Sequence, residues 1–304
     1  MDLSNWMGAA TSLHDRPLTN LHMPGSHDSL AYSITTKLPL SPNDCPSIVY
    51  KLRGLPCTKE IVRQWSLTQD LNIAEQLSAG IRYVDVRTAY YAGDKTLRAI
   101  HGLYGATTNS LLSQIRDWLV SHKREVVILD FNHFDGFNDD VSIYDSLVQI
   151  IVQIFNGMLV PPQADISKLT LNSIYQQLGG HGGVIVIYET NQGAGRDRLW
   201  SGNVISSPWA NTSSLATLFP FLETHITNRA SNQLLVTQGI LTPQTSDVVK
   251  HLTGCLKDQL AVPATIAVNK WVPSLDPKLK PKLNIVMVDF VETDAIAQTV
   301  INSN

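Results

Sequence analysis

Several short apolar runs in this sequence end in polar side chains that could perform acid and base chemistry. These side chains are His27, Asp28, Asp85, Arg87, His101, Asn132, His133 and Asp289. Two imidazoles can divide a proton transfer between them, because one ring takes a proton while the other gives one. The guanidinium of an arginine carries a permanent charge in a planar shape that suits phosphate oxygens. If they converge, these side chains could break a phosphate ester.

The run from Gly80 to Arg87 has the alternation of a β-strand. This alternation predicts that Tyr83, Asp85 and Arg87 share one face and that Arg82 lies on the other. A buried salt bridge between Asp85 and Arg87 is the structural alternative to a phosphate contact. His27 follows Pro24-Gly25, which we interpret as a sharp turn that lifts the imidazole, whereas His22 is expected to be a packed wall residue of the first strand.

Short apolar runs alternate with segments of helical period, which predicts an α/β protein. The expected strands are Pro17–His22, Gly80–Val86, Thr96–Ile100, Glu125–Phe131, Gly183–Tyr188, Asn203–Ser206, Gln233–Gln238 and Asn284–Asp289, and the expected helices include Asn72–Ser78, Ser110–His122 and Val141–Gly157. Eight strands with helices between them favour a single (β/α)8 barrel over residues 1–304, with its chemistry at the carboxyl ends of the strands. An open doubly wound sheet would need a glycine-rich phosphate turn after its first strand, and none is present.

The segment from Thr35 to Gln69 is long for a connection between a strand and a helix. It contains four prolines, at positions 39, 42, 46 and 56. Loops of this length at the active end of a barrel often form lids or rims, so we expect the segment to border the site.

Composition excludes several classes of protein. The net charge is −3, and no run of Lys or Arg is present, which argues against nucleic acid as a partner. No apolar stretch reaches the roughly 20 residues of a membrane span, and no signal peptide is evident. We therefore expect a cytoplasmic protein, peripheral to membranes at most and monomeric. Cys45, Cys57 and Cys255 lack metal-site spacing and are expected to be reduced.

Taken together, these motifs resemble the phosphatidylinositol-specific phospholipase C X-domain proteins. The matching segments are Met23–Ser29, Gly80–Arg87, His101–Gly105, Val127–Phe134, Ser207–Thr212 and Val288–Val291. Their order is most similar to that of the small eukaryotic members, which contain only the X domain. The resemblance implies a distorted barrel that cleaves a phosphoinositide into diacylglycerol and an inositol phosphate through an inositol 1,2-cyclic phosphate.

The same resemblance implies roles for individual residues. His27 matches the general base and Asp289 the carboxylate that orients it, while His101 matches the general acid, with Asp28 as its partner. Arg87 stands where the bacterial enzymes have an arginine that acts on the phosphate. The expected substrate-binding residues are Asp85, Asn132, His133 and Trp209. Trp200 and Trp209 could contact the bilayer, with core packing as the alternative.

The match departs from the large eukaryotic phospholipases C at their calcium site. The corresponding positions hold Asp28, Asp85, Arg87 and Asn132, and a guanidinium among them would repel calcium. We therefore expect no cofactor, with a metal held by Asp28, Asp85 and Asn132 as the alternative. A catalytically weak barrel that binds phosphoinositides as a scaffold is the competing function. A metal-dependent glycerophosphodiesterase would need a cluster of glutamates at the strand ends, which this sequence lacks.

Overall fold

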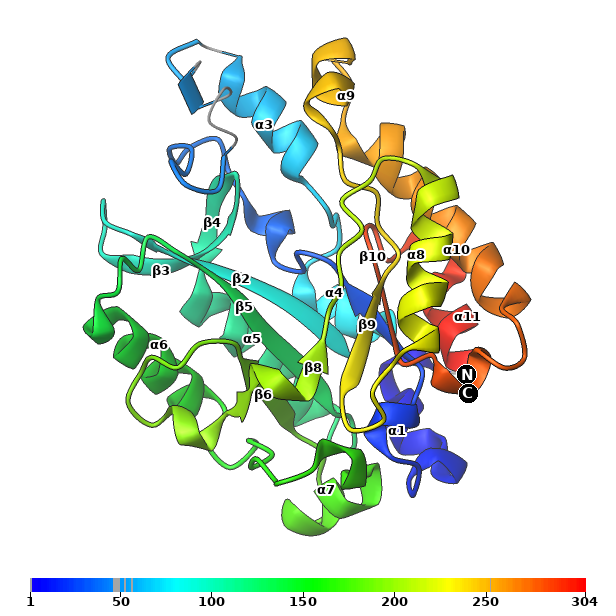
Figure 1. Cartoon of the computed structure of the whole chain (residues 1–304). Coiled ribbons are helices and arrows are strands. Elements are labelled where there is room, and N and C mark those ends of the chain that lie inside the picture. Colours follow the sequence, from blue (N-terminus) through cyan, green and yellow to red (C-terminus); the bar gives the residue numbers. More distant parts are fainter. Residues whose placement is uncertain (1, 46–49, 52, 56, 252) are drawn as a thin grey trace.

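The computed structural model describes residues 2–45, 50–51, 53–55, 57–251 and 253–304, and its centre is a curled parallel sheet (Figure 1). The eight parallel strands lie in the order β7-β6-β5-β2-β1-β10-β9-β8. Their bounds are β1 Met23–Ser26, β2 Tyr83–Tyr91, β5 Val127–Asp135, β6 Val184–Tyr188, β7 Trp200–Ser201, β8 Ile205–Ser206, β9 Leu234–Gln238 and β10 Ile285–Val288. In the described part of the chain no strand pairing joins β7 to β8. The predicted α/β barrel is therefore confirmed in a distorted form, as a half-barrel.

The first expected strand was misplaced. Residues 17–22 form a 3₁₀ turn at Leu18–Asn20, and β1 starts only at Met23. Pro24 and Gly25 lie inside β1 and do not form the predicted turn. A Cβ on Gly25 would come within 2.9 Å of the Tyr83 ring, so glycine allows the close approach of β1 to β2.

His22 consequently precedes the strand and is not part of the barrel wall. It is nevertheless a packed residue, because its Nδ1 lies 2.8 Å from the Ser303 hydroxyl. Burial and the charge of Arg16 lower the pKa of His22 to about 4, which keeps the ring neutral.

The third expected strand, residues 96–100, does not belong to the barrel. It forms β3 (Thr96–His101), which pairs antiparallel with β2 and with β4 (Leu103–Thr107). The eighth parallel strand is instead β7, which was not expected. Its two residues are too few to show an alternation of apolar and polar side chains. The sixth expected strand, residues 203–206, shortens to β8.

Helices cover both outer sides of the curled sheet (Figure 1). The expected helices are present as α4 Ile73–Ser78, α5 Thr108–Ser121 and α6 Val141–Ile154. Other helices of the described residues include α1 Trp6–Ala9, α3 Thr58–Ser66, α7 Leu171–Gln177, α8 Leu215–Thr227, α9 Thr245–Lys250, α10 Val262–Ser274 and α11 Ile296–Asn302. Apolar faces of α5 and α6 pack on β2, β5 and β6, while α8, α10 and α11 pack on β9 and β10. Among the described residues, no helix combines the length and apolar character that crossing a bilayer requires.

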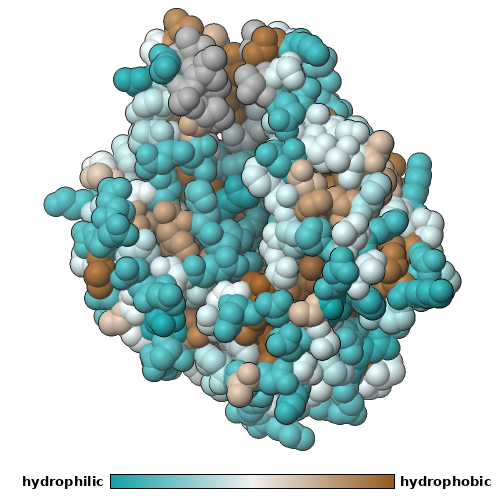
Figure 2. All heavy atoms as spheres, viewed as in Figure 1, coloured by the Kyte–Doolittle hydropathy of each residue, from teal (hydrophilic) through white to brown (hydrophobic). Residues whose placement is uncertain are grey.

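The barrel interior is apolar at its amino end and polar at its carboxyl end. Met23, Ile128, Ile185 and Ile285 fill the interior together with Trp6 from the N-terminal segment. In the space-filling view, hydrophilic side chains line a depression between the two sides of the molecule (Figure 2). Polar chemistry is therefore confined to one end, over a packed floor.

The described residues of the segment from residue 35 to 69 include α3, which stands above the carboxyl ends of the strands (Figure 1). Pro46 and Pro56 lie outside the described residues. The three cysteines are free thiols, as predicted.

Candidate functional site

The first histidine is held between two neighbouring parallel strands. His27 directly follows β1 and Asp289 directly follows β10, and these strands pair through Ser26 and Val288. His27 Nδ1 lies 2.8 Å from Asp289 Oδ1, and the His27 backbone N–H donates to the Val288 carbonyl at 3.0 Å. The strand register thus places the imidazole beside its carboxylate.

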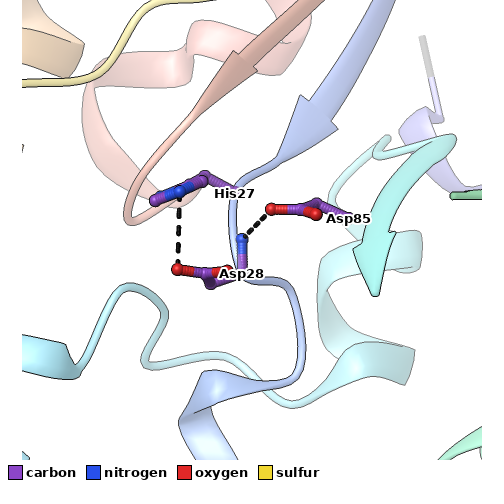
Figure 3. A group of neighbouring side chains, drawn as sticks. All are labelled: His27, Asp28 and Asp85. Atoms are coloured by element: carbon purple, nitrogen blue, oxygen red, sulfur yellow. Dashed lines mark hydrogen bonds and ion pairs between the residues drawn. The ribbon is translucent and has the colours of Figure 1, made fainter. Parts of the chain in front are cut away.

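Asp28 is the central carboxylate of the site, with a side chain that is only 1% exposed. Its backbone has a φ of 40°, in the left-handed region that Asp tolerates better than most residues. The Asp28 N–H donates to Asp85 Oδ2 at 2.8 Å, and Asp28 Oδ2 lies 3.4 Å from His27 Nε2 (Figure 3). This conformation turns the Asp28 carboxylate toward the strand ends.

Arg87 brings a positive charge to the same point. The register of β2 against β5 shifts between Val86 and Arg87, a β-bulge of the kind that redirects a side chain. The guanidinium Nη2 lies 3.2 Å from His27 Nε2, and Nε contacts Asp28 Oδ1 and lies 4.0 Å from Asp85 Oδ2. Arg87 therefore forms a salt bridge with Asp28 and also lies beside His27.

His101, at the end of β3, approaches the same oxygen of Asp28 as His27. Its Nε2 is 3.2 Å from Asp28 Oδ2 and its Nδ1 is 2.7 Å from the Ser66 carbonyl oxygen. A carbonyl only accepts hydrogen bonds, so Nδ1 carries a hydrogen and Nε2 faces the site. The two imidazole centroids are 6.3 Å apart. One carboxylate oxygen is therefore close to both histidines.

The charged groups of the cluster stabilise one another's ionised forms. Burial alone would lower the pKa of His27, but the carboxylates of Asp28 and Asp289 outweigh it and raise the pKa to about 9. Burial opposes the ionisation of Asp28, yet Arg87, His101 and His27 hold the pKa of Asp28 below its ordinary value. Asp28 is therefore an anion beside two groups that can carry positive charge.

A second polar layer lies below this cluster. Asn132 Nδ2 donates to Asp85 Oδ1 at 2.8 Å, which places these two of the four expected substrate-binding residues side by side. The Tyr83 hydroxyl donates to Asp130 Oδ2 at 2.7 Å. Burial and the nearby charge of Glu189 raise the pKa of Asp130 well above its ordinary value. Asp130 was not among the expected site residues, although an aspartate inside an apolar strand was a visible signal.

The remaining expected site residues lie further out. His133 is partly exposed, and its Nε2 lies 3.3 Å from Asp44 Oδ1. Trp209 is 54% exposed in the loop after β8, and its indole N–H donates to the Thr242 hydroxyl at 2.8 Å. Trp200 is buried and donates to the Val160 carbonyl, as expected of a core residue. The structure thus brings six expected residues close to Asp28 and places His133 and Trp209 toward the rim.

The site also contains the combination of atoms from which a cation site could be built. His27, Asp28 and Asp85 each offer a ligand atom within 4.8 Å of the others (Figure 3). Both carboxylates already have partners, since Asp28 contacts Arg87 and Asp85 accepts from the Asp28 N–H and from Asn132.

Comparison with curated sequences relates the whole chain to known proteins. The chain is 35% identical over 305 residues to the mouse PI-PLC X domain-containing protein 2, covering 99% of this chain and 87% of that protein. The chain belongs to the PI-PLC X domain-containing proteins. It is also 35% identical to the human PI-PLC X domain-containing protein 3, covering 100% of this chain and 94% of the relative. No family model matches the sequence.

Solved structures extend the comparison of the fold. The phosphatidylinositol-specific phospholipase C of Listeria monocytogenes superimposes with a TM-score of 0.70 at 19% identity, covering 100% of this chain and 99% of the other. A mutant of the phosphatidylinositol-specific phospholipase C of Staphylococcus aureus gives a TM-score of 0.67 at 16% identity, covering 100% and 97% of the two chains. This X domain-containing protein therefore has the fold of the bacterial phospholipases C.

Proposed function

We propose that the protein is a phosphodiesterase that cleaves phosphoinositides at a membrane surface into diacylglycerol and inositol 1,2-cyclic phosphate. The observation that carries the proposal is that His27 and His101 both lie close to Asp28 Oδ2, with Arg87 beside them, at the polar end of the barrel. The fold of the bacterial phospholipases C and the names of the curated relatives support the same chemistry.

In this mechanism His27 acts as the general base. Asp289 accepts the hydrogen of Nδ1, so that the neutral ring presents the lone pair of Nε2 to the site. The inositol 2-hydroxyl oxygen attacks phosphorus, and its proton passes to Nε2. Asp289 then stabilises the imidazolium that forms.

His101 acts as the general acid in the same step. As the bond from phosphorus to the glycerol oxygen breaks, the proton on His101 Nε2 passes to that oxygen and diacylglycerol leaves. Each proton transfer is typically worth roughly 10²- to 10⁴-fold in rate. The Arg87 guanidinium offsets the negative charge that develops on the phosphate oxygens.

We propose that this reaction needs no calcium. Calcium binds six to eight oxygen ligands, whereas the candidate group includes an imidazole nitrogen and two carboxylates that already have partners. Arg87 places a permanent charge among them. The residues therefore fit a guanidinium better than a calcium ion, and no step is assigned to a metal.

The test of the proposed function is an assay of the purified protein on phosphatidylinositol vesicles, followed by phosphorus NMR. We expect the cyclic phosphodiester signal to appear as the lipid signal declines. Vesicle binding without turnover would contradict the proposal and favour a phosphoinositide-binding scaffold.

The raised pKa of His27 predicts the pH dependence of the reaction. The base must be unprotonated and the acid protonated, so kcat/KM should rise with pH as His27 loses its proton and fall where His101 loses its own. Because the pKa of His27 is about 9, this acid limb should lie well above the ordinary histidine value. Asp289→Asn removes a negative charge that favours the protonated ring of His27. The acid limb of the pH profile should therefore move to lower pH, while the maximal rate falls.

Two further variants make this pH prediction decisive. Asp94→Asn, on an exposed carboxylate that pairs with Arg98, should leave the acid limb where it is in the wild type. The double variant His27→Ala/Asp289→Asn should be scarcely slower than His27→Ala alone, because Asp289 acts through His27. Additive losses, or an acid limb that Asp289→Asn does not move, would show that Asp289 acts elsewhere.

A further inference from the structure

Residues 41–44, here called the strap, tie the rim of the site to the end of β5. Asp135 accepts hydrogen bonds from the Ser41 hydroxyl and, at 2.7 Å, from Asn43 Nδ2. Two residues earlier on β5, His133 pairs with Asp44. The strap is therefore fastened to the barrel at both of its ends.

The other side of the strap holds the tight turn between β3 and β4. The Ser41 N–H donates to the Gly102 carbonyl at 3.0 Å, and the Gly102 N–H donates to Asp44 Oδ2. Gly102 has a φ of +68°, and a Cβ there would lie 2.8 Å from the Ser66 hydroxyl oxygen. The turn is thus enclosed between α3 and the strap.

Asp44 is suited to hold the Gly102 turn because its side chain is ionised. Burial opposes its charge, but the hydrogen bond from His133, the charge of His101 and the Gly102 N–H hold the pKa of Asp44 well below its ordinary value. Hydrogen bonds to a charged acceptor are stronger than those between neutral groups. The Asp44 side chain is only 8% exposed, so little water competes for it.

We propose that Asp44 is a positioning residue for His101. By holding the Gly102 N–H it fixes the turn, so that His101 Nδ1 stays on the Ser66 carbonyl and Nε2 stays on Asp28. The inference rests on the proposed function, in which His101 is the general acid. Nothing in the resemblance or the expected site pointed to Asp44, which lies in no strand and follows no strand end.

A poorly placed general acid slows the cleavage of some substrates more than that of others. A glycerol oxygen is strongly basic and needs a proton as it leaves, whereas 4-nitrophenolate is a stable anion that does not. Loss of positioning at His101 should therefore slow cleavage of the lipid and spare an aryl ester. General damage to the site would slow both.

The experiment compares two soluble substrates, so that membrane binding does not enter. They are dihexanoyl-phosphatidylinositol below its micellar concentration and inositol 1-(4-nitrophenyl phosphate). We expect Asp44→Ala to lower kcat for the lipid by about 10-fold or more and to change that for the aryl ester by less than about 3-fold. Asp44→Asn should restore part of the loss, because its uncharged amide oxygen can still accept a hydrogen bond from the Gly102 N–H.

Asp117→Ala is the matched control, because Asp117 is an exposed carboxylate on α5 that pairs with Arg116 and bonds neither the strap nor Gly102. It should leave the rates on both substrates unchanged. An equal loss on both substrates in Asp44→Ala, or no loss on either, would overturn the role of Asp44. A wild type that cleaves neither substrate would instead overturn the proposed function.

Nitrogen NMR of the histidine rings tests the positioning without turnover. Asp44→Ala should shift the ring signals of His101 and leave those of the exposed His181 unchanged. Unchanged His101 signals would overturn the inference even in an inactive protein.

Discussion

Replacing either His27 or His101 by alanine is expected to lower the turnover of phosphatidylinositol by at least about 10²-fold. Each substitution removes one partner of the coupled proton transfer, since His27 faces Asp289 and His101 faces Asp28. Water cannot easily take over the proton transfer of either ring, because the Asp28 carboxylate that both rings approach is buried.

The fold should survive both substitutions. The His27 and His101 side chains lie at the polar end of the barrel and belong to none of its apolar clusters, so truncating them leaves the packed core in place. The hydrogen bond from the His27 backbone to Val288 remains. Thermal unfolding should therefore give midpoints close to that of the wild type, which separates lost chemistry from lost structure.

The matched control is His181→Ala, at an exposed histidine before β6, at the opposite end of the barrel. It should keep wild-type turnover. The two roles can also be told apart, because an aryl ester leaving group needs no acid. His101→Ala should retain most activity on inositol 1-(4-nitrophenyl phosphate), whereas His27→Ala should not. Near-normal activity of either alanine variant on the lipid would contradict the assignment.

The parts of the site that the sequence predicts well are those that follow regular strands. Apolar runs locate β5, β6, β9 and β10, and parallel strands present their carboxyl ends at one edge. His27 and Asp289 meet for this reason, even though 262 residues separate them. The start of β1 was misplaced because its sequence, Met-Pro-Gly-Ser, has neither alternation nor an apolar run.

His101 was placed at the site by an argument that was partly wrong. The strand before it was expected to be a parallel barrel strand, but β3 folds back on β2. Only residues 92–95 connect β2 to β3, and a crossover between parallel strands needs a dozen residues or more. This short connection was the signal for a hairpin.

Asp44 and Ser66 could not have been found in this way. They lie in the segment between β1 and β2, outside any strand, and their contacts with the β3–β4 turn depend on how that segment folds over the barrel. Periodicity describes regular elements and carries no information about such contacts.

The second large effect concerns Arg87 and calcium. Arg87 contacts Asp28 and lies 4.0 Å from Asp85, so its charge occupies the space between the carboxylates that a cation would need. The charges of Asp28 and Asp85 outweigh burial and raise the pKa of Arg87 further above its ordinary value. The guanidinium is therefore charged at any working pH.

Turnover of phosphatidylinositol by the wild type should consequently survive an excess of EGTA. Arg87→Asp should lower it by about 10²-fold or more, since removing one preorganised charge from a transition state costs that much. Arg116→Asp is the matched control, because Arg116 is exposed on α5 and pairs with its neighbour Asp117, away from the site. It should leave turnover unchanged.

Calcium could restore part of the activity of Arg87→Asp. The new carboxylate would join Asp28 and Asp85, giving three acidic side chains where a guanidinium stood, and calcium prefers such oxygen ligands. Asn132 would add an uncharged oxygen at most, so the rescue should be incomplete and should need high calcium. Diacylglycerol release should be measured for each variant with chelator and again with calcium in excess. If turnover by the wild type instead stops with EGTA and recovers with calcium, Arg87 is not the charge that acts on the phosphate. Asp28, Asp85 and Asn132 must then hold a metal ion that acts on it.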